Sequence, residues 1–488
     1  MQHKYCEHRL HSLQKKVNSC MFVGSKYLMI MKKSIIITVV LLVAFIGGIY
    51  WMVNRVPSAD AGKNEQMAAI ISDAGCLDCH TASPKLPFYA SLPLAGDLVK
   101  KDAADGYRAF DIEPMYQAVK GGEKVSEVDL AKVEKVIADG TMPPAKYYMV
   151  HWSAYINAKE KAIALDWIEE CRAKFYPNKL AAGEFLNETV RPIEEAVEVN
   201  PLKAILGEML YHDTRLSVDN TVSCASCHGL NTGGVDNKQF SEGVNGLKGG
   251  VNAPTVFNAH YNFVQFWDGR AATLAAQAAG PPLNPVEMAS TSFDEICAKL
   301  KADAAFDKAF TAVYPEGITE QTITDAIQEF ERTLLTPNSP FDKYLKGDKN
   351  AVNSDVVEGY ELFKKYDCAT CHVGENLGGQ SYELMGIMAD YFGDRGTELT
   401  IEDNGRNKET KLPRDKHRFK VPGLRNVALT APYFHDGTQA TLAEAVAAMG
   451  RYEVGVEIGE AEIAQMVVFL NSLTGEYKGK VLTNDNMK

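Results

Sequence analysis

The motif Cys-x-x-Cys-His occurs three times along this chain, and no other feature restricts its fold as strongly. In this spacing the two cysteines can each add to a vinyl group of haem, and the histidine that follows can face the iron as an axial ligand. One copy would also fit a redox pair or a zinc site, but three copies downstream of an export segment predict c-type haem attachment. We therefore expect three covalently bound haem c groups. They would be held by Cys76, Cys79 and His80, by Cys224, Cys227 and His228, and by Cys368, Cys371 and His372.

The three motifs recur at nearly equal distances, which predicts three related units. Their first cysteines stand at positions 76, 224 and 368 of the 488 residues. Each unit closes with apolar residues at the i, i+3, i+4, i+7 spacing of an amphipathic helix, and strand signals are weak. We expect a mainly α fold with three cytochrome-c-like helical haem domains, over residues 70–178, 196–345 and 353–478, after a single N-terminal transmembrane helix. The closing stripes are Ala164/Trp167/Ile168/Cys171, Ile323/Ala326/Ile327/Phe330 and Ile463/Met466/Val467/Leu470.

The transmembrane helix is predicted from residues 35–53, an apolar run without a charged side chain. At 1.5 Å per residue this run nearly spans a bilayer core of about 30 Å. Lys32 and Lys33 precede it, so the positive-inside rule predicts that residues 1–34 are cytoplasmic. We expect a single-pass anchor in the inner (cytoplasmic) membrane, with the haem domains in the periplasm.

Two alternatives at the N-terminus remain open. Ala59-Asp60-Ala61 resembles a signal-peptide cleavage site, although the apolar region of a signal peptide is usually shorter than this run. Met31 directly precedes Lys32 and the apolar run. If Met31 is the true start, residues 1–30 are not translated.

The charge balance excludes one class of function. The chain has 51 basic and 63 acidic residues and a formal charge of −12. A nucleic-acid-binding protein needs a basic face to meet phosphates, so we expect no nucleic-acid partner.

The sixth iron ligands are sought among the methionines, because a methionine opposite histidine raises the potential of a haem. Met142 lies in Gly140-Thr141-Met142-Pro143-Pro144, where prolines restrict the backbone and suit a fixed thioether. His151, nine residues later, is the competing ligand for the first haem. Met449 is a candidate in the third unit, but by position alone most methionines fill cores.

From about residue 200 to 475 the sequence resembles bacterial di-haem cytochrome c peroxidases. Residues 70–175 resemble a separate family of small haem-binding domains, through Cys76 to His80, Leu86-Pro87-Phe88-Tyr89 and Met142-Pro143-Pro144. The combination with an anchor resembles tri-haem quinol peroxidases. The peroxidase-like stretches are Thr214-Arg215-Leu216-Ser217, Cys224 to His228, Asn252 to Asn258, Gln265-Phe266-Trp267-Asp268-Gly269-Arg270, Asn284-Pro285-Val286-Glu287-Met288 and Ala431 to Gly437.

The resemblance implies a role for each haem of the peroxidase part. His228 would carry the peroxidatic haem and His372 the electron-transfer haem, with Met449 as its distal ligand. Trp267 would lie between these two haems. Asn252, Thr430 and Pro432 match the family's inter-domain calcium site, and oxygen ligands of this kind suit Ca²⁺.

The resemblance also implies the catalytic groups. Glu287 matches the family's acid/base, which takes a proton from one oxygen of peroxide and returns it to the other, and Gln277 matches its neighbouring hydrogen-bond donor. Two positions depart from the family pattern. Val244 stands where many relatives have a histidine that closes the peroxidatic iron, and Val251 replaces an arginine.

The implied function is reduction of hydrogen peroxide to water by a membrane-anchored tri-haem peroxidase, an enzyme of the cytochrome c peroxidase type. Quinol and a small cytochrome c both remain open as electron donor, and a homodimer fits the family. Two alternative functions are an electron-transfer or redox-sensing cytochrome without peroxidase turnover, and a di-haem relative that oxidises a protein side chain. Glu287, Gln277 and Trp267 argue against the first alternative. Met449 argues against the second, because that relative has tyrosine there.

Overall fold

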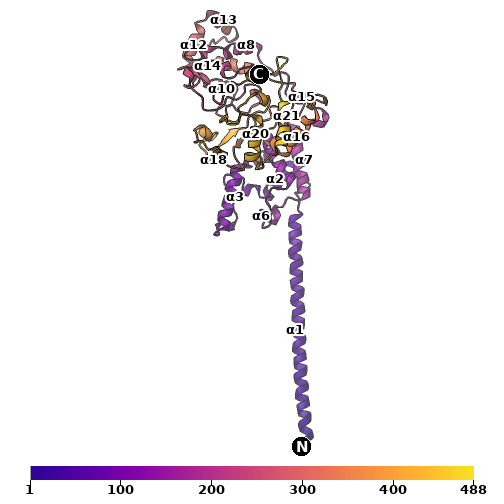
Figure 1. The fold of residues 1–488 in the computed structure, drawn as a ribbon. Coiled ribbons are helices and arrows are strands. Elements are labelled where there is room, and N and C mark those ends of the chain that lie inside the picture. The colour runs from indigo at the N-terminus through magenta and orange to yellow at the C-terminus, as the bar shows by residue number, and fades with distance from the viewer. Residues whose placement is uncertain (1, 488) are drawn as a thin grey trace.

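One long helix, α1 (Gln2–Val53), precedes the helical domains in the computed structural model, which describes residues 2–487 (Figure 1). Its apolar side chains from Ile35 to Ile46 are exposed. Within the described residues, it is the helix that is long and apolar enough to cross a membrane. The predicted apolar N-terminal helix and the predominance of α structure are both confirmed.

The first domain surrounds the motif at Cys76. Its last helix begins where the side chain of Asn157 accepts hydrogen bonds from the backbone N–H groups of Lys159 and Glu160, which have no partner inside the helix. The predicted stripe of that helix, which includes Trp167 and Cys171, is buried against neighbouring helices. The helices are α2 (Lys63–Asp73), α3 (Ala95–Ala109), α4 (Glu113–Gly121), α5 (Glu127–Asp139), α6 (Ala145–Tyr148) and α7 (Ala158–Phe175).

The second domain is built on a close crossing of its first helix with a later one, α14. A Cβ atom on Gly207 would lie 1.9 Å from the carbonyl oxygen of Ala326, so the two helices approach closely only because residue 207 is glycine. The predicted stripe of α14, from Ile323 to Phe330, is buried at this crossing. The helices are α8 (Pro201–Tyr211), α9 (Cys224–Cys227), α10 (Leu274–Ala278), α11 (Gly280–Leu283), α12 (Phe293–Lys301), α13 (Ala304–Val313) and α14 (Glu320–Arg332). The next helix, α15 (Pro340–Leu345), packs through Phe341 and Leu345 into the core of the third domain.

The third domain repeats this crossing. A Cβ atom on Gly359 would lie 2.3 Å from the carbonyl oxygen of Gln465 in the closing helix. The helices are α16 (Ser354–Lys365), α17 (Cys368–Cys371), α18 (Tyr391–Asp394), α19 (Asn407–Thr410), α20 (Leu442–Met449) and α21 (Glu460–Asn471). Strands are few in the described residues: β1 (Tyr382–Leu384) pairs antiparallel with β2 (Arg418–Lys420), and β3 (Glu476–Tyr477) with β4 (Lys480–Val481).

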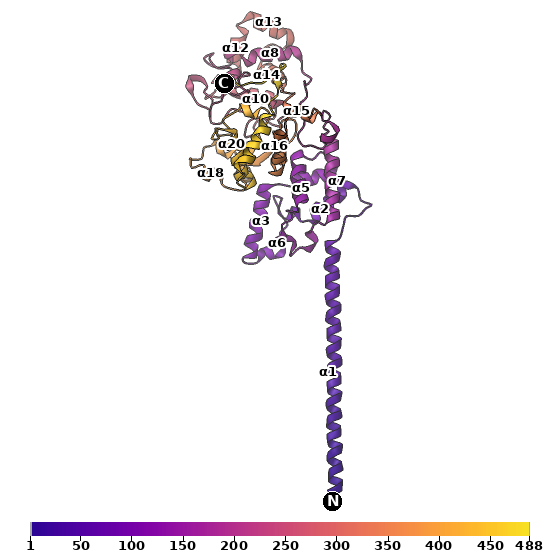
Figure 2. The ribbon, with the colours of Figure 1, turned by 45° about the vertical axis from the view of Figure 1, so that its right-hand side comes forward.

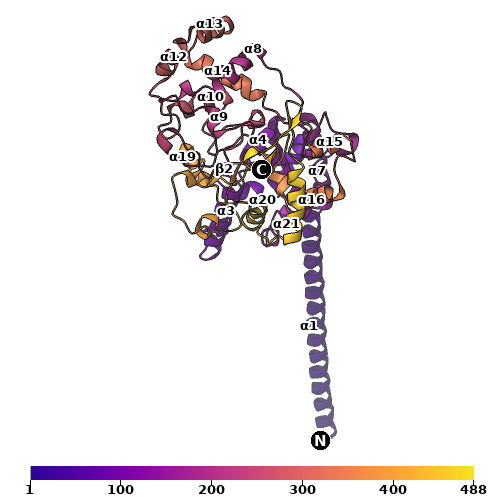
Figure 3. The ribbon, with the colours of Figure 1, turned by 45° about the horizontal axis from the view of Figure 1, so that its top comes forward.

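The order of the domains in space differs from their order along the chain. The first domain lies next to α1, the third domain with α16, α20 and α21 lies above it, and the second domain with α8 and α12–α14 lies farthest from α1 (Figures 1 and 2). A third view also separates α12–α14 from α3 by the third domain (Figure 3). The third domain therefore stands between the other two.

The contact between the first and third domains is partly apolar and partly ionic. Val128 and Ala131 of α5 pack on Val373, the residue after His372, and form a small buried core. Ion pairs surround it: Arg191 with Glu127 at 2.5 Å, Lys132 with Glu383 at 2.7 Å and Arg414 with Asp111 at 2.6 Å. Helix α5 of the first domain therefore lies directly over the haem-attachment motif of the third.

Candidate functional site

The histidines of the first and third motifs are oriented by the same kind of contact. Nδ1 of His80 lies 3.1 Å from the carbonyl oxygen of Phe110, and Nδ1 of His372 lies 2.9 Å from that of Leu377. When Nδ1 donates to a carbonyl, the lone pair of the neutral ring is on Nε2, the nitrogen that would bind iron. Both rings are thus oriented as axial ligands require.

One cavity of about 680 Å³ joins these two motifs. Cys76, His80 and Met142 line one part of it, and the third motif and Met449 line another. The walls are mainly apolar and their residues come from all three domains. The structure thus brings the first and third haem-attachment motifs to one continuous space.

The two candidate ligands of the first haem have different surroundings. Met142 lines the cavity together with His80. His151 is engaged elsewhere: its Nε2 lies 2.8 Å from the hydroxyl of Tyr89, and its Nδ1 lies 3.0 Å from the carbonyl oxygen of Tyr147. The geometry favours Met142, because both ring nitrogens of His151 already have hydrogen-bond partners.

The cavity also holds a buried cation that fits an anionic group. Lys420 is 5% exposed and lines the cavity, and burial lowers its pKa to about 8. Within the described residues its ammonium has no carboxylate partner. A buried charge without a partner is costly, so Lys420 suits a propionate of a haem, and the cavity fits that cofactor.

The histidine of the second motif, His228, is also buried. Cys224 to Cys227 form α9, and the hydroxyl of Tyr211 donates to the carbonyl oxygen of His228. The backbone carbonyl groups of Gly234 and Pro254 lie beside its buried ring. Burial lowers the pKa of His228, which favours the neutral ring that iron binds.

Glu287 lies close to this second motif. After burial, several negative charges raise the pKa of the free thiols of Cys224 and Cys227: Glu331 for Cys224, Asp236 for Cys227 and, more weakly, Glu287 for both. Burial also raises the pKa of Glu287 itself, against the opposing charge of Arg270 and a 2.6 Å hydrogen bond from the side-chain amide of Asn284. A carboxyl group with a raised pKa beside a haem-attachment site suits proton transfer.

The segment around Val244 is tied to Glu287. The N–H of Val244 donates to the carbonyl oxygen of Glu287 at 2.8 Å. A Cβ atom on Gly243 would lie 2.3 Å from that same oxygen, so glycine permits the close approach. The side chain of Val244 is 1% exposed and belongs to the core of the second domain. Gln277 is half-buried on α10.

Trp267 lies at the boundary between the second and third domains. It lines the large cavity, and its indole N–H donates to the carbonyl oxygen of Asn252 at 2.9 Å. Its own carbonyl oxygen accepts from the N–H of Lys420. Asn252, Thr430 and Pro432, the three predicted calcium-site residues, also line this cavity.

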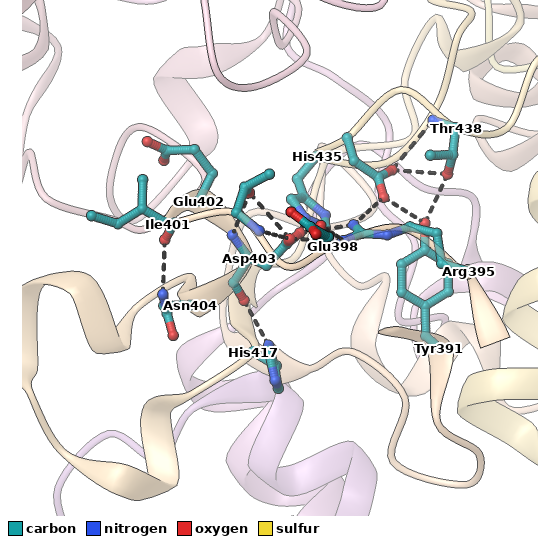
Figure 4. Close-up of polar contacts among 12 residues, drawn as sticks. Tyr391, Arg395, Glu398, Ile401, Glu402, Asp403, Asn404, His417, His435 and Thr438 are labelled. Atoms are coloured by element: carbon teal, nitrogen blue, oxygen red, sulfur yellow. Dashed lines mark hydrogen bonds and ion pairs between the residues drawn. The ribbon is translucent and has the colours of Figure 1, made fainter. Parts of the chain in front are cut away.

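A buried polar network around Arg395, Asp403 and His435 was not predicted from the sequence (Figure 4). His435 lies edge-on to Trp267, stacks on Phe419 with ring centroids 4.2 Å apart, and is bonded through Nε2 to Asp403 at 2.8 Å. Arg395 connects Asp403 to Asp436 through ion pairs of 2.8 and 2.9 Å.

Asp403, His435 and Asp436 are grouped closely enough to hold a metal ion. The guanidinium of Arg395, however, already compensates both carboxylates. Burial alone would raise the pKa of Asp403, but Arg395 and His435 together hold it well below its usual range. The group is therefore a structural ion-pair network. The only sequence signal was His435-Asp436-Gly437, because Arg395 and Asp403 lie in a loop without a periodic pattern.

Comparison with known proteins identifies two parts of the chain. Residues 201–350 match the family model of di-haem cytochrome c peroxidase, and residues 52–170 match that of a haem-binding domain. Cytochrome c peroxidase Ccp of Escherichia coli (strain K12) is 49% identical over 423 residues, which cover 86% of this chain and 90% of that protein.

Two further relatives match the peroxidase part. Cytochrome c551 peroxidase of Nitrosomonas europaea is 47% identical over 292 residues, covering 59% of this chain and 85% of that protein. The crystal structure of a MauG-like protein associated with microbial copper homeostasis has 29% identity and a TM-score of 0.52, and the match covers 57% of this chain and 91% of that one. With the haem-attachment sites described above, these matches show that the chain belongs to the di-haem cytochrome c peroxidase family of oxidoreductases, with a separate haem-binding domain before the peroxidase part.

Proposed function

We propose that this peroxidase is anchored in the inner membrane by α1, carries three haem c groups, and reduces hydrogen peroxide to water in the periplasm with electrons from quinol or a small cytochrome c. The observation that carries the proposal is the position of the third domain. Its motif shares a cavity with the first motif, and α5 of the first domain packs on Val373 beside His372. The first haem domain is thus attached where it can supply electrons to the peroxidase part.

The order of the three sites in space supports one direction of electron flow. Haem bound at the three motifs would carry electrons one at a time. The haem at His228 would also supply the iron that takes up peroxide. Electrons would enter at the His80 site, pass to the His372 site and end at the His228 site. The ligands would be Met142 for the first site and Met449 for the third, both of which line the cavity. Trp267 stands at the boundary between the last two domains.

Glu287 would move the proton. Reduction of one peroxide molecule consumes two electrons and two protons and yields two water molecules. In its ionised form Glu287 can take a proton from one oxygen of peroxide and return it to the other oxygen, which leaves as water. Gln277 would donate a hydrogen bond beside it. Asn284 holds the carboxylate in place through its amide.

The calcium site would stabilise the boundary between the two peroxidase domains. Asn252 already connects three parts of that boundary: its N–H donates to the carbonyl oxygen of His435 at 2.8 Å, its carbonyl oxygen accepts from Trp267, and its side-chain amide donates to the carbonyl oxygen of Lys238. The side-chain oxygen of Asn252 and the backbone oxygens of Thr430 and Pro432 would be ligands of the type that Ca²⁺ prefers.

The test is steady-state peroxide reduction by membranes that contain the full chain, with quinol as the sole donor. We expect turnover that is lost when Cys76 and Cys79 are both replaced by alanine. The same double variant should keep turnover with a chemical reductant that reaches the peroxidase part directly. Equal quinol-driven turnover in parent and double variant would show that the first domain does not carry the electrons.

A further inference from the structure

The part of the first domain that lies next to α1 exposes an unusual number of large apolar side chains. Phe88 is 84% exposed, Leu94 85%, Met149 69% and Val150 69%. Contiguous exposed patches of this kind mark interaction surfaces. We call this set, with its exposed neighbours, the apolar face. The neighbours are Leu92, Leu98 and Tyr155.

The two segments that form the apolar face are held together by polar contacts behind it. The hydroxyl of Tyr89 lies 2.8 Å from Nε2 of His151, and Lys146 forms an ion pair of 2.7 Å with Asp102 of α3. In two views, α3 and α6 both lie at the end of the domain from which α1 leaves (Figures 1 and 2). The two segments that carry the apolar face therefore lie together at that end of the molecule.

The apolar face is fixed relative to α1. The side-chain amide of Asn157 donates to the carbonyl oxygens of Val53 and Arg55 at 3.2 and 2.6 Å, and Arg55 donates to the carbonyl oxygen of Ser153 at 2.9 Å. Trp152 lies edge-on to Phe45 of α1, with ring centroids 5.5 Å apart. These contacts fasten the segment around Trp152 to the side of the helix.

This attachment determines the depth of the face. Eight residues separate Phe45 from Val53, a rise of about 12 Å at 1.5 Å per residue. If residues 35–53 fill the hydrocarbon core, Phe45 stands near its centre, so Trp152 lies deep in the outer leaflet. Met149, whose carbonyl oxygen accepts from the indole N–H of Trp152, lies there with Val150. Apolar side chains at that depth contact acyl chains and are not exposed to water.

We propose that the apolar face is embedded in the outer leaflet of the membrane and holds the adjoining end of the first haem domain among the acyl chains. The partner is the bilayer itself. A lipid-soluble donor can then reach the first haem site from the membrane. Two hydrogen bonds lie at the edge of the apolar face, beside the first haem site. One joins Tyr89 to His151, and in the other the hydroxyl of Tyr147 donates to Asp78 of the haem motif at 2.6 Å. The proposal rests on the anchoring by α1 proposed above.

The experiment measures the depth of single positions in full-length holoprotein reconstituted into phosphatidylethanolamine–phosphatidylglycerol vesicles. A nitroxide label is attached to one introduced cysteine at a time, after Cys6 and Cys20 are replaced by serine. The accessibility of the label to oxygen and to a water-soluble nickel complex gives its depth. The positions are Leu94 and Val150 in the apolar face, Leu42 in α1, and the exposed Leu202 in α8 as the matched control far from the membrane.

We expect labels at Leu94, Val150 and Leu42 to be reached by oxygen and protected from nickel, and the label at Leu202 to show the reverse. The proposal is wrong if Leu94 and Val150 behave like Leu202 while Leu42 lies in lipid; the anchoring by α1 would then still hold. A label at Leu42 that is open to nickel would overturn the anchoring as well.

Discussion

Glu287 is the residue on which peroxide turnover should depend most. Replacing it by glutamine keeps the size of the side chain and its contact with Asn284, but removes the group that accepts the proton. A general acid/base contributes typically about 10²–10⁴-fold. We expect Glu287→Gln to retain all bound haem and to lose peroxidase kcat by a factor of this order, measured by steady-state peroxide consumption. Glu316→Gln, at an exposed position of the same domain, is the control. Turnover within a few-fold of the parent would contradict the assignment.

The environment of Glu287 predicts a pH dependence with a definite sign. Burial raises the pKa of Glu287, while Arg270 and the amide of Asn284 favour the charged form and oppose that shift. Asn284→Ala removes the hydrogen bond to the charged form, so the pKa should rise further. Because the base must be ionised, the acid limb of the kcat/KM profile should move to higher pH, with little change on the alkaline side.

The matched control for that shift is Asn187→Ala. The amide of Asn187 also donates to a glutamate, Glu169, at 2.9 Å, but on the exposed surface. The Asn187→Ala variant should leave the pH profile of kcat/KM unchanged. If the acid limb of Asn284→Ala stays in place or moves to lower pH, Glu287 is not the group that titrates.

At the scale of elements, the loop around Met142 should supply the sixth ligand of the first haem. Met142 lines the cavity with His80, whereas both ring nitrogens of His151 have hydrogen-bond partners. Met142→Ala should abolish the methionine-to-iron charge-transfer band of this haem in the long-wavelength absorption spectrum. His151→Gln is the control and should leave that band. The reverse result would make His151 the ligand.

The segment around Val244 should leave the peroxidatic iron open. Val244 is buried in the domain core and its N–H is bonded to the carbonyl oxygen of Glu287, and a valine side chain has no lone pair to donate. The fully ferric protein should therefore show a high-spin signal in its EPR spectrum and bind cyanide quickly without prior reduction. The contrary result is a fully ferric sample that is entirely low-spin and reacts with peroxide only after one-electron reduction. It would show that another side chain, such as Met288 or His260, closes the site.

The closing helices show how far a sequence pattern can predict local structure. The stripes of α7 and α14 are buried as predicted. In α21 the buried face includes Phe469, and the predicted Ile463 and Val467 are only half-buried. Periodicity places a helix face to within about one residue, but the partner helix selects which neighbours are fully covered. Here Phe469 packs against Phe341 and Tyr360, and no local sequence pattern predicts these contacts.

At the scale of the whole molecule, the haem-attachment motifs could be found from the sequence because they are short and contiguous. Glu287 could be proposed because it stands in a short stretch that resembles the family. The arrangement of the domains could not. Lys132 and Glu383 form their ion pair across the first and third domains, and Val128 meets Val373 in the same interface. Such pairs lie far apart in the chain, and each residue alone looks like an ordinary surface lysine, glutamate or core valine.

This interface gives the last prediction. The ammonium of Lys132 lies 2.7 Å from the carboxylate of Glu383, with side chains only 21% and 19% exposed. Lys132→Glu places two carboxylates together and Glu383→Lys two ammonium groups, and like charges at an interface cost several kcal/mol.

Either single variant should slow reduction of the third haem by the first, measured by stopped-flow absorbance. The double variant Lys132→Glu/Glu383→Lys restores an attractive pair, so it should recover most of the parent rate. Peroxide turnover with a reductant that reaches the third domain directly should be similar in all four proteins, because the ion pair joins the first domain to the third. Single variants that transfer electrons as fast as the parent would mean that the first domain delivers its electrons by another surface.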